Sequence, residues 1–335
     1  MGKILVTGAT GHIGNVLVRA LLAKGRQVRA LIWRGEDTTP LEGLDVEQVE
    51  GDVLDLDSLA PAFKDVDKVY HLAGLISIMP GKQDLVQRVN VGGTRNMLQC
   101  ARQFGVQRFI YTSSIHALER APQGVLIDES LCFDPVNPLG AYDCSKAAAS
   151  LAVKEAVQQG LDAVLVCPTG VIGPYDYRRS EMGEVIRAAA EQKPQLYVEG
   201  AYDFVDVRDV AQGMILAEEK GRSGESYILS GERISVRYLL ETIREITGKG
   251  FFSLKVPTSL AHFVARFTPT YYRLTKSKPR ITPYSLEVLN SNCHISHEKA
   301  TRELGYKPRL LRESLTDTVA WFLEYYRLRA SPKSA

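Results

Sequence analysis

The sequence predicts an α/β protein with a doubly wound parallel sheet and a smaller, mostly helical C-terminal lobe. Over the first two thirds of the 335 residues, short β-branched segments alternate with longer helical patterns, as in parallel sheets covered on both faces. A glycine-rich turn separates the first strand from the first helix, and loops rich in Gly, Pro, Tyr and Arg follow Pro168. These three observations define the expected architecture.

Seven strands are expected, at residues 3–7, 28–33, 46–50, 68–72, 108–113, 163–167 and 226–229. Helices are expected at residues 13–24, 85–104, 142–159, 181–192, 207–220, 235–247, 296–304 and 311–326. Periodic apolar side chains support the first helix, and Gly25 is a suitable C-cap for it. We expect a larger domain of residues 1–167, to which 204–230 return. Residues 168–203 and 231–330 then form a substrate-binding lobe at the carboxyl ends of the strands, where ligands of open α/β sheets bind.

Composition argues against several classes of function. The chain has 41 basic and 39 acidic residues, a net charge of +2, which gives no electrostatic basis for nucleic-acid binding. Its five cysteines are scattered, without CxxC or Cys/His pairing, so we expect reduced thiols in a cytoplasmic protein and no metal site. No apolar run of about 18 residues predicts a membrane span, and the N-terminus shows no signal-peptide cleavage pattern.

The glycine-rich turn predicts a site for a dinucleotide. Its glycines, Gly8, Gly11 and Gly14, follow the first strand and open the first helix, with Thr10, His12 and Ile13 between them. Glycine lets the backbone approach a pyrophosphate, and the helix N-terminus offers free N–H groups and a positive dipole. The turn therefore predicts a Rossmann-type nucleotide-binding domain.

The end of the second strand bears on the choice of cofactor. An acid there binds the ribose 2′-hydroxyl of NAD, whereas an arginine suits the 2′-phosphate of NADP. Trp33 and Arg34 occupy this position and no acid occurs before Glu36. This favours NADP as the cofactor, with NAD as the alternative.

Tyr142 and Lys146 predict the reacting groups. Four residues apart on a helix, they share one face. A free tyrosine has a pKa of about 10, and a nearby cation is expected to lower it towards the working range. Ser113 and Ser114 precede the pair at an expected strand end. With the glycine-rich turn, these residues predict a redox site.

The combined motifs resemble the extended short-chain dehydrogenase/reductases of the NAD-dependent epimerase/dehydratase superfamily, in particular the dihydroflavonol reductase-like branch. The resemblance spans nearly the whole chain. It rests on the glycine-rich turn and on these further motifs: Gly51-Asp52-Val53, His71-Leu72-Ala73-Gly74, Asn90-Val91-Gly92-Gly93-Thr94, Tyr111-Thr112-Ser113-Ser114, Tyr142 to Lys146, Gly173-Pro174 and Phe204-Val205-Asp206-Val207.

The resemblance implies a role for each motif. Ser114, Tyr142 and Lys146 would be catalytic: Ser114 would bond the substrate oxygen, Tyr142 would exchange a proton with it, and Lys146 would hold the nicotinamide ribose. The remaining positions would contact the cofactor: Asp52 and Val53 at the adenine, Leu72, Ala73 and Gly74 at the inner ribose, and Pro168 beside the nicotinamide amide.

The favoured function is an NADP(H)-dependent oxidoreductase that reduces a ketone or aldehyde to an alcohol, or catalyses the reverse reaction. The alternative is a nucleotide-sugar epimerase or dehydratase with bound NAD. Relatives of that kind usually carry an Arg-x-x-Asn and a further Arg, where this chain has Cys167, Gly170 and Tyr202. A nucleotide-sensing protein without catalysis ranks last, because Tyr142 and Lys146 are both present. The expected partner is a small carbonyl or alcohol substrate.

Three further expectations concern partners and the pocket. A homodimer seam would use Leu98, Ala101 and Phe104 of one helix and Ala147, Ser150, Leu151 and Val153 of another. Arg178 and Arg179 would grip an anionic substrate or be solvated, and His116 would line the pocket or be packed. The apolar segment 260–272 would form a lid, a membrane contact or, more simply, a core helix.

Overall fold

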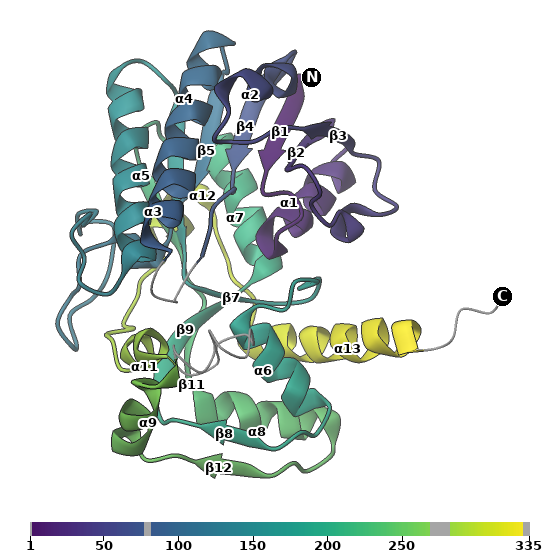
Figure 1. The fold of residues 1–335 in the computed structure, drawn as a ribbon, viewed down its shortest axis with the longest axis vertical. Coiled ribbons are helices and arrows are strands. Elements are labelled where there is room, and N and C mark those ends of the chain that lie inside the picture. The colour runs from purple at the N-terminus through teal and green to yellow at the C-terminus, as the bar shows by residue number, and fades with distance from the viewer. Residues whose placement is uncertain (1, 77–81, 269–281, 331–335) are drawn as a thin grey trace.

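The computed structural model describes residues 2–76, 82–268 and 282–330. A seven-stranded parallel sheet forms the centre of the larger domain (Figure 1). Its spatial order is β3-β2-β1-β4-β5-β6-β10. The strands are β1 (Lys3–Thr7), β2 (Val28–Ile32), β3 (Glu47–Glu50), β4 (Val66–His71), β5 (Arg108–Thr112), β6 (Ala163–Pro168) and β10 (Ser226–Leu229). The order reverses between β1 and β4, which opens a crevice at their carboxyl ends.

Alternating side chains of the strands bury the sheet on both faces. Ile4 and Val6 of β1 belong to one core and Leu5 to the other. The first core is covered by α1 (His12–Ala23), α7 (Val207–Lys220) and α12 (Glu298–Leu304). The second is covered by α2 (Leu56–Phe63), α4 (Gly93–Gln103) and α5 (Ala141–Gln158). The expected doubly wound sheet is therefore confirmed, whereas α2 was not anticipated.

The long helix expected at residues 85–104 is interrupted. It consists of α3 (Gln83–Gln87), a π-helix (Arg88–Gly92) and α4 in direct succession. π-Helical turns are uncommon and often mark functional sites. This π-helix contains Asn90, whose side-chain amide is buried and donates a hydrogen bond to Ser145 of α5.

The smaller lobe combines helices with two small sheets (Figure 1). One has the order β11-β9-β7, from Glu232–Ser235, Ala201–Asp206 and Gly170–Ile172; the other pairs β12 (Ser253–Lys255) with β8 (Gln195–Tyr197). Its helices are α6 (Glu181–Ala190), α8 (Val236–Thr247), α9 (Thr258–Ala265), α11 (Pro283–Leu289) and α13 (Leu311–Ala330). Residues 199–203, expected to form a loop, instead lead into and begin β9.

Two segments lie elsewhere than the expected division suggests. Because β9 belongs to the second sheet, the chain returns to the main sheet at α7. The helix α12, expected in the lobe, packs on the main sheet through Ala300 and Leu304. The apolar segment 260–272 contains the end of α9, whereas its residues 269–272 lie outside the described residues. Among the described helices, none has the length and hydropathy needed to cross a bilayer.

Candidate active site

The residues expected to bind cofactor gather at the carboxyl ends of the parallel strands. The backbone N–H groups of Leu72 and Ala73 donate to Thr7 Oγ1 (3.2 and 3.0 Å), which joins the ends of β4 and β1. Val53 accepts a bond on its carbonyl from Asn96 Nδ2 (2.8 Å), and Asp52 accepts one from the Leu54 N–H (2.9 Å). Pro168 ends β6 opposite Leu229 of β10. These residues form one edge of the sheet.

The glycine-rich turn has the close packing that a phosphate cradle requires. A Cβ on Gly14 would lie 2.0 Å from the Gly8 carbonyl oxygen, so only glycine lets α1 sit this close to the turn. Helix α1 begins after Gly11, and no side chain caps its first N–H groups. Those groups fit a pyrophosphate. The turn therefore suits a dinucleotide.

Tyr142, Ser114 and Lys146 lie together at the opposite side of the crevice. Tyr142 is in the first turn of α5, and the Ser114 side chain is near enough to its hydroxyl to lower the pKa of that hydroxyl. Ser113 points away instead, with its Oγ 2.7 Å from Ser150 Oγ. Lys146 Nζ donates to the Thr112 carbonyl (2.7 Å), and a Cβ on Gly74 would lie 3.5 Å from it. The three predicted catalytic side chains thus share one location.

The expected effect of Lys146 on Tyr142 is wrong. Burial raises the pKa of Tyr142 to about 12; the bond to Ser114 opposes the rise and the charge of Asp143 adds to it. Burial also lowers the pKa of Lys146 to about 8. Ser114 is the group that lowers the pKa of Tyr142 and so favours the phenolate, and Lys146 is not among the causes of the shift.

Asn90 connects the loop after β4 to the first turn of α5, which carries Tyr142, although sequence reasoning gave Asn90 no role. Its Oδ1 accepts from the Leu75 N–H (2.7 Å) and its Nδ2 donates to Ser145 Oγ (2.8 Å). Ser145 Oγ in turn donates to the Tyr142 carbonyl (2.7 Å). Asn90 therefore holds the loop after β4 against the first turn of α5. The Asn-Val-Gly-Gly-Thr motif was the only sequence signal for it.

Side chains of both the larger domain and the lobe surround Tyr142. His116 Nε2 lies 2.7 Å from the Tyr202 hydroxyl, and the two rings stack. Burial lowers the pKa of His116 to about 4, so its ring is neutral. Tyr284 of α11 donates to Asp143 Oδ1 (2.9 Å), and burial raises the pKa of Asp143 to about 7. A cavity of about 450 Å³ adjoins His116 and Tyr202.

Near the expected position of the adenosine ribose, the structure places the carboxylate of Glu36 rather than the predicted guanidinium of Arg34. The Arg34 side chain is 88% exposed, with its Nε 3.8 Å from Glu50 Oε1. Glu36 instead turns back towards the glycine-rich turn: Gly35 has a φ of +77°, and the Trp33 N–H donates to Glu36 Oε2 (3.0 Å). Thr10 Oγ1 donates to Glu36 Oε1 (2.6 Å). Sequence reasoning passed over Glu36 because it lies two residues beyond Arg34, although Gly35 was a signal for a turn that reverses the chain.

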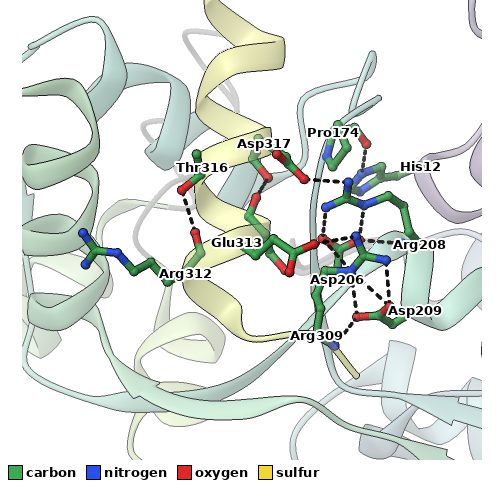
Figure 2. Close-up of polar contacts among 12 residues, drawn as sticks. His12, Pro174, Asp206, Arg208, Asp209, Arg309, Arg312, Glu313, Thr316 and Asp317 are labelled. Carbon is green, nitrogen blue, oxygen red and sulfur yellow. Dashed lines mark hydrogen bonds and ion pairs between the residues drawn. The ribbon is translucent and has the colours of Figure 1, made fainter. Parts of the chain in front are cut away.

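A charge network fastens the lobe to the base of the crevice (Figure 2). Asp206 is buried and accepts bonds from Arg208, whose other guanidinium nitrogen contacts Asp317 of α13 (2.7 Å). Arg309 binds Asp209 in a similar way (3.0 Å). Beside this network His12 donates to the Pro174 carbonyl (3.0 Å). The position of His12 is therefore fixed by a contact with the loop after β7.

The side chains expected to form a dimer seam lie mostly inside the molecule. Ala101, Ala147, Ser150 and Val153 are fully buried within the subunit, while Leu151 is 42% and Phe104 37% exposed. Between α4 and α5 the surface is a groove, lined by Leu98 as well as by polar residues such as Arg95, Gln99 and Glu155. The apolar faces of both helices largely serve the sheet, and the homodimer remains a prediction.

Comparisons with known proteins agree with this geometry. Residues 4–230 match the model of the NAD dependent epimerase/dehydratase family. A sterol demethylase protein B of Methylococcus capsulatus is 38% identical over 96% of this chain and 98% of its own length. A putative dihydroflavonol 4-reductase of Synechocystis sp. is 34% identical over 95% of this chain and 93% of its own.

Solved structures give the same result. The crystal structure of gox2253 has a TM-score of 0.84 and 34% identity, covering 97% of this chain and 99% of that one. The UDP-glucose 4-epimerase of Thermotoga maritima has a TM-score of 0.78 at 21% identity, which shows the shared fold. Fold and site define a nucleotide-binding α/β protein of the short-chain dehydrogenase/reductase type. The chain belongs to the NAD dependent epimerase/dehydratase family.

Proposed function

We propose that this protein is a nicotinamide-dependent oxidoreductase that interconverts a ketone or aldehyde and an alcohol. The observation that carries the proposal is that the Ser114 side chain acts on the buried Tyr142 hydroxyl, which lies on the same helix, α5, as Lys146, whose Nζ lies next to Gly74. When bound, a nicotinamide dinucleotide supplies or accepts the hydride. Tyr142 donates the proton to the substrate oxygen in reduction, and Ser114 stabilises the charge that develops on that oxygen.

The positions that distinguish nucleotide-sugar enzymes support this choice. A Cβ on Gly170 would lie 2.9 Å from the rings of both Tyr202 and Phe204. An asparagine there would therefore collide with aromatic side chains. Tyr202, at the position of the expected arginine, bonds His116 and is neutral. At these two described positions, the charge-assisted donors that suit a sugar-nucleotide diphosphate are thus absent.

We also propose NAD(H) rather than NADP(H) as the preferred cofactor. The expectation of NADP depended on Arg34, which is solvent-exposed and near Glu50. Glu36 instead brings a carboxylate to Thr10 of the glycine-rich turn. An acid at this position suits a ribose 2′-hydroxyl and repels a 2′-phosphate.

The names of the relatives indicate which substrates to examine first. The cavity beside His116 has a mixed lining, with apolar side chains such as Ile115 and Leu139 and polar ones such as Arg120 and Asn290. One relative is named for sterols and two are named 3 beta-hydroxysteroid dehydrogenase/Delta 5-->4-isomerase. Ring ketones and secondary alcohols are therefore the first substrates to examine.

The test is a substrate panel followed by the absorbance of the reduced nicotinamide. Ring ketones, aldehydes, secondary alcohols and nucleotide sugars are each assayed with the wild type and with Tyr142→Phe. We expect turnover of a ketone or alcohol that the variant loses. Epimerisation of a nucleotide sugar by protein that retains oxidised NAD through purification would support the alternative. Absence of cofactor binding would reject both.

A further inference from the structure

A loop of the lobe reaches across the first helix to the glycine-rich turn. It follows β7, and its contacts with α1 are regularly spaced: the Pro174 carbonyl accepts from His12, the Tyr175 carbonyl from Asn15 (3.2 Å), and the Tyr177 hydroxyl from Arg19 (3.3 Å). The next residue along the loop is Arg178. Its position is therefore determined by a series of contacts along α1.

Arg178 joins Thr10 and Glu36 in a closed set of three contacts. Its Nη2 donates to Thr10 Oγ1 and to Glu36 Oε1, both at 2.6 Å, and Thr10 Oγ1 donates to the same Glu36 oxygen. The Glu36 side chain is 17% exposed and that of Arg178 is 51% exposed. The guanidinium of Arg178, from the lobe, thus lies beside Thr10 of the glycine-rich turn, where it is paired with the Glu36 carboxylate.

We propose that Glu36 and Arg178 together set the choice between NAD and NADP, and that Glu36 masks a latent site for the 2′-phosphate. The inference rests on the proposed nicotinamide-binding function. The Glu36 carboxylate occupies the guanidinium and repels a phosphate. In Glu36→Gln that carboxylate no longer competes with a phosphate for the Arg178 guanidinium beside the glycine-rich turn, and guanidinium groups bind phosphate well.

The pair explains why Arg34 is the wrong arginine for this role. Arg34 follows β2 directly, as a 2′-phosphate donor does in the usual pattern, yet its side chain is almost fully exposed. Arg178 is 144 positions further along the chain and reaches Thr10 only through the fold (178 − 34 = 144). Arg178 is therefore the residue to substitute in the test, and Arg34 is its matched control.

The test measures NADH and NADPH binding by nicotinamide fluorescence for the wild type, Glu36→Gln, Arg178→Ala and the double variant. Wild type should bind NADH at least about tenfold more tightly than NADPH, a difference of about 1.4 kcal/mol. Glu36→Gln should tighten NADPH binding about tenfold, and Arg178→Ala in that background should abolish the gain. Arg34→Ala in the same background should leave it intact.

Other results separate the two proposals. If wild type binds neither nucleotide, the proposed function fails. If it binds NADPH more tightly, if Glu36→Gln changes nothing, or if the gain survives without Arg178, the inference fails and the proposed function remains. Glu36→Ala repeats the comparison if the glutamine variant does not fold, as checked by circular dichroism.

Discussion

The side chains at the two ends of the nucleotide crevice differ in burial and in charge. At the catalytic end, Tyr142 and Lys146 are removed from water, and burial moves both pKa values: that of Tyr142 rises to about 12 and that of Lys146 falls to about 8. At the adenosine end, Glu36 and Arg178 are partly exposed and form a direct ion pair. On the proposed function, burial tunes a proton transfer at one end, whereas a charge pair selects the cofactor at the other.

This contrast makes separable predictions, because substitutions at one end should leave the other function unchanged. The largest effect is expected for Tyr142→Phe. Loss of the hydroxyl that we propose exchanges the substrate proton should lower turnover by about 10²- to 10⁴-fold. NADH affinity, measured by fluorescence, should change by less than about threefold. A change of that size corresponds to well under 1.4 kcal/mol of binding free energy. A variant that kept its turnover would break the comparison.

Ser114→Ala should lower turnover by about a hundredfold, the usual effect of removing one donor to a developing oxyanion. It should also move the pH profile. The bond from Ser114 lowers the pKa of Tyr142, so its removal should raise that pKa further. Alcohol oxidation requires the phenolate, so its rate should rise with pH in the wild type, and the rise should shift to higher pH in the variant.

Ser113→Ala is the matched control for this profile. Its hydroxyl faces Ser150, and removing it leaves the Tyr142–Ser114 contact in place. The variant should keep the wild-type pH dependence whatever its stability. An equal shift in both variants would mean that the effect is a general loosening of the site.

Gly14→Ala tests the nucleotide end without changing a charge. The added Cβ would meet the Gly8 carbonyl at 2.0 Å, and such overpacking typically costs about 1–3 kcal/mol. We expect NADH affinity to fall about tenfold or more, while turnover at saturating cofactor changes little. Gly250→Ala, where a Cβ meets nothing within 4 Å, is the control. Equal losses in both variants would contradict the cradle.

Asp143→Asn should have the smallest effect on turnover and a clear effect on stability. Burial raises the pKa of Asp143 from 3.8 to about 7, so the folded state binds more protons than the unfolded state between these values. Its contribution to stability is therefore lost as pH rises from about 4 to about 7. The variant lacks this loss, and its advantage in free energy of unfolding should grow with pH, by at most on the order of 3 kcal/mol.

Urea unfolding at several pH values measures the difference. Tyr284, Tyr142, Tyr202 and Arg120 are the groups that face this carboxyl. Burial opposes its charge, whereas the hydrogen bond from Tyr284 and the charge of Arg120 favour it. Asp128→Asn is the control, because hydrogen bonds from Ser130 lower the pKa of that exposed carboxyl. A difference between Asp143→Asn and wild type that did not vary with pH would contradict the effect of burial.

The same contrast explains what the sequence predicted and what it did not. Six of the seven strands of the main sheet are largely buried, the edge strand β3 being the exception, and strands buried on both faces leave continuous apolar signals in the sequence. The strands β7, β8 and β12 have three residues each, too few for a periodic pattern. The lobe sheets were therefore missed.

At the site, local spacing was sufficient for some residues only. Tyr142 and Lys146 are one helical turn apart, and the three glycines belong to one turn, so a short window of sequence contains each motif. Arg178 reaches Thr10 from a distant loop, and Asn90 reaches Ser145 from a π-helix. Contacts of that kind depend on tertiary structure. The pKa of Tyr142 was misjudged because spacing does not reveal burial.

The most direct measurement is a crystal structure of the protein with NADH. It should place the nicotinamide ring beside Tyr142 and Lys146, and the adenosine ribose beside Glu36. A dinucleotide bound in the opposite direction, or Tyr142 turned away from the ring towards solvent, would contradict the division of labour between the two ends.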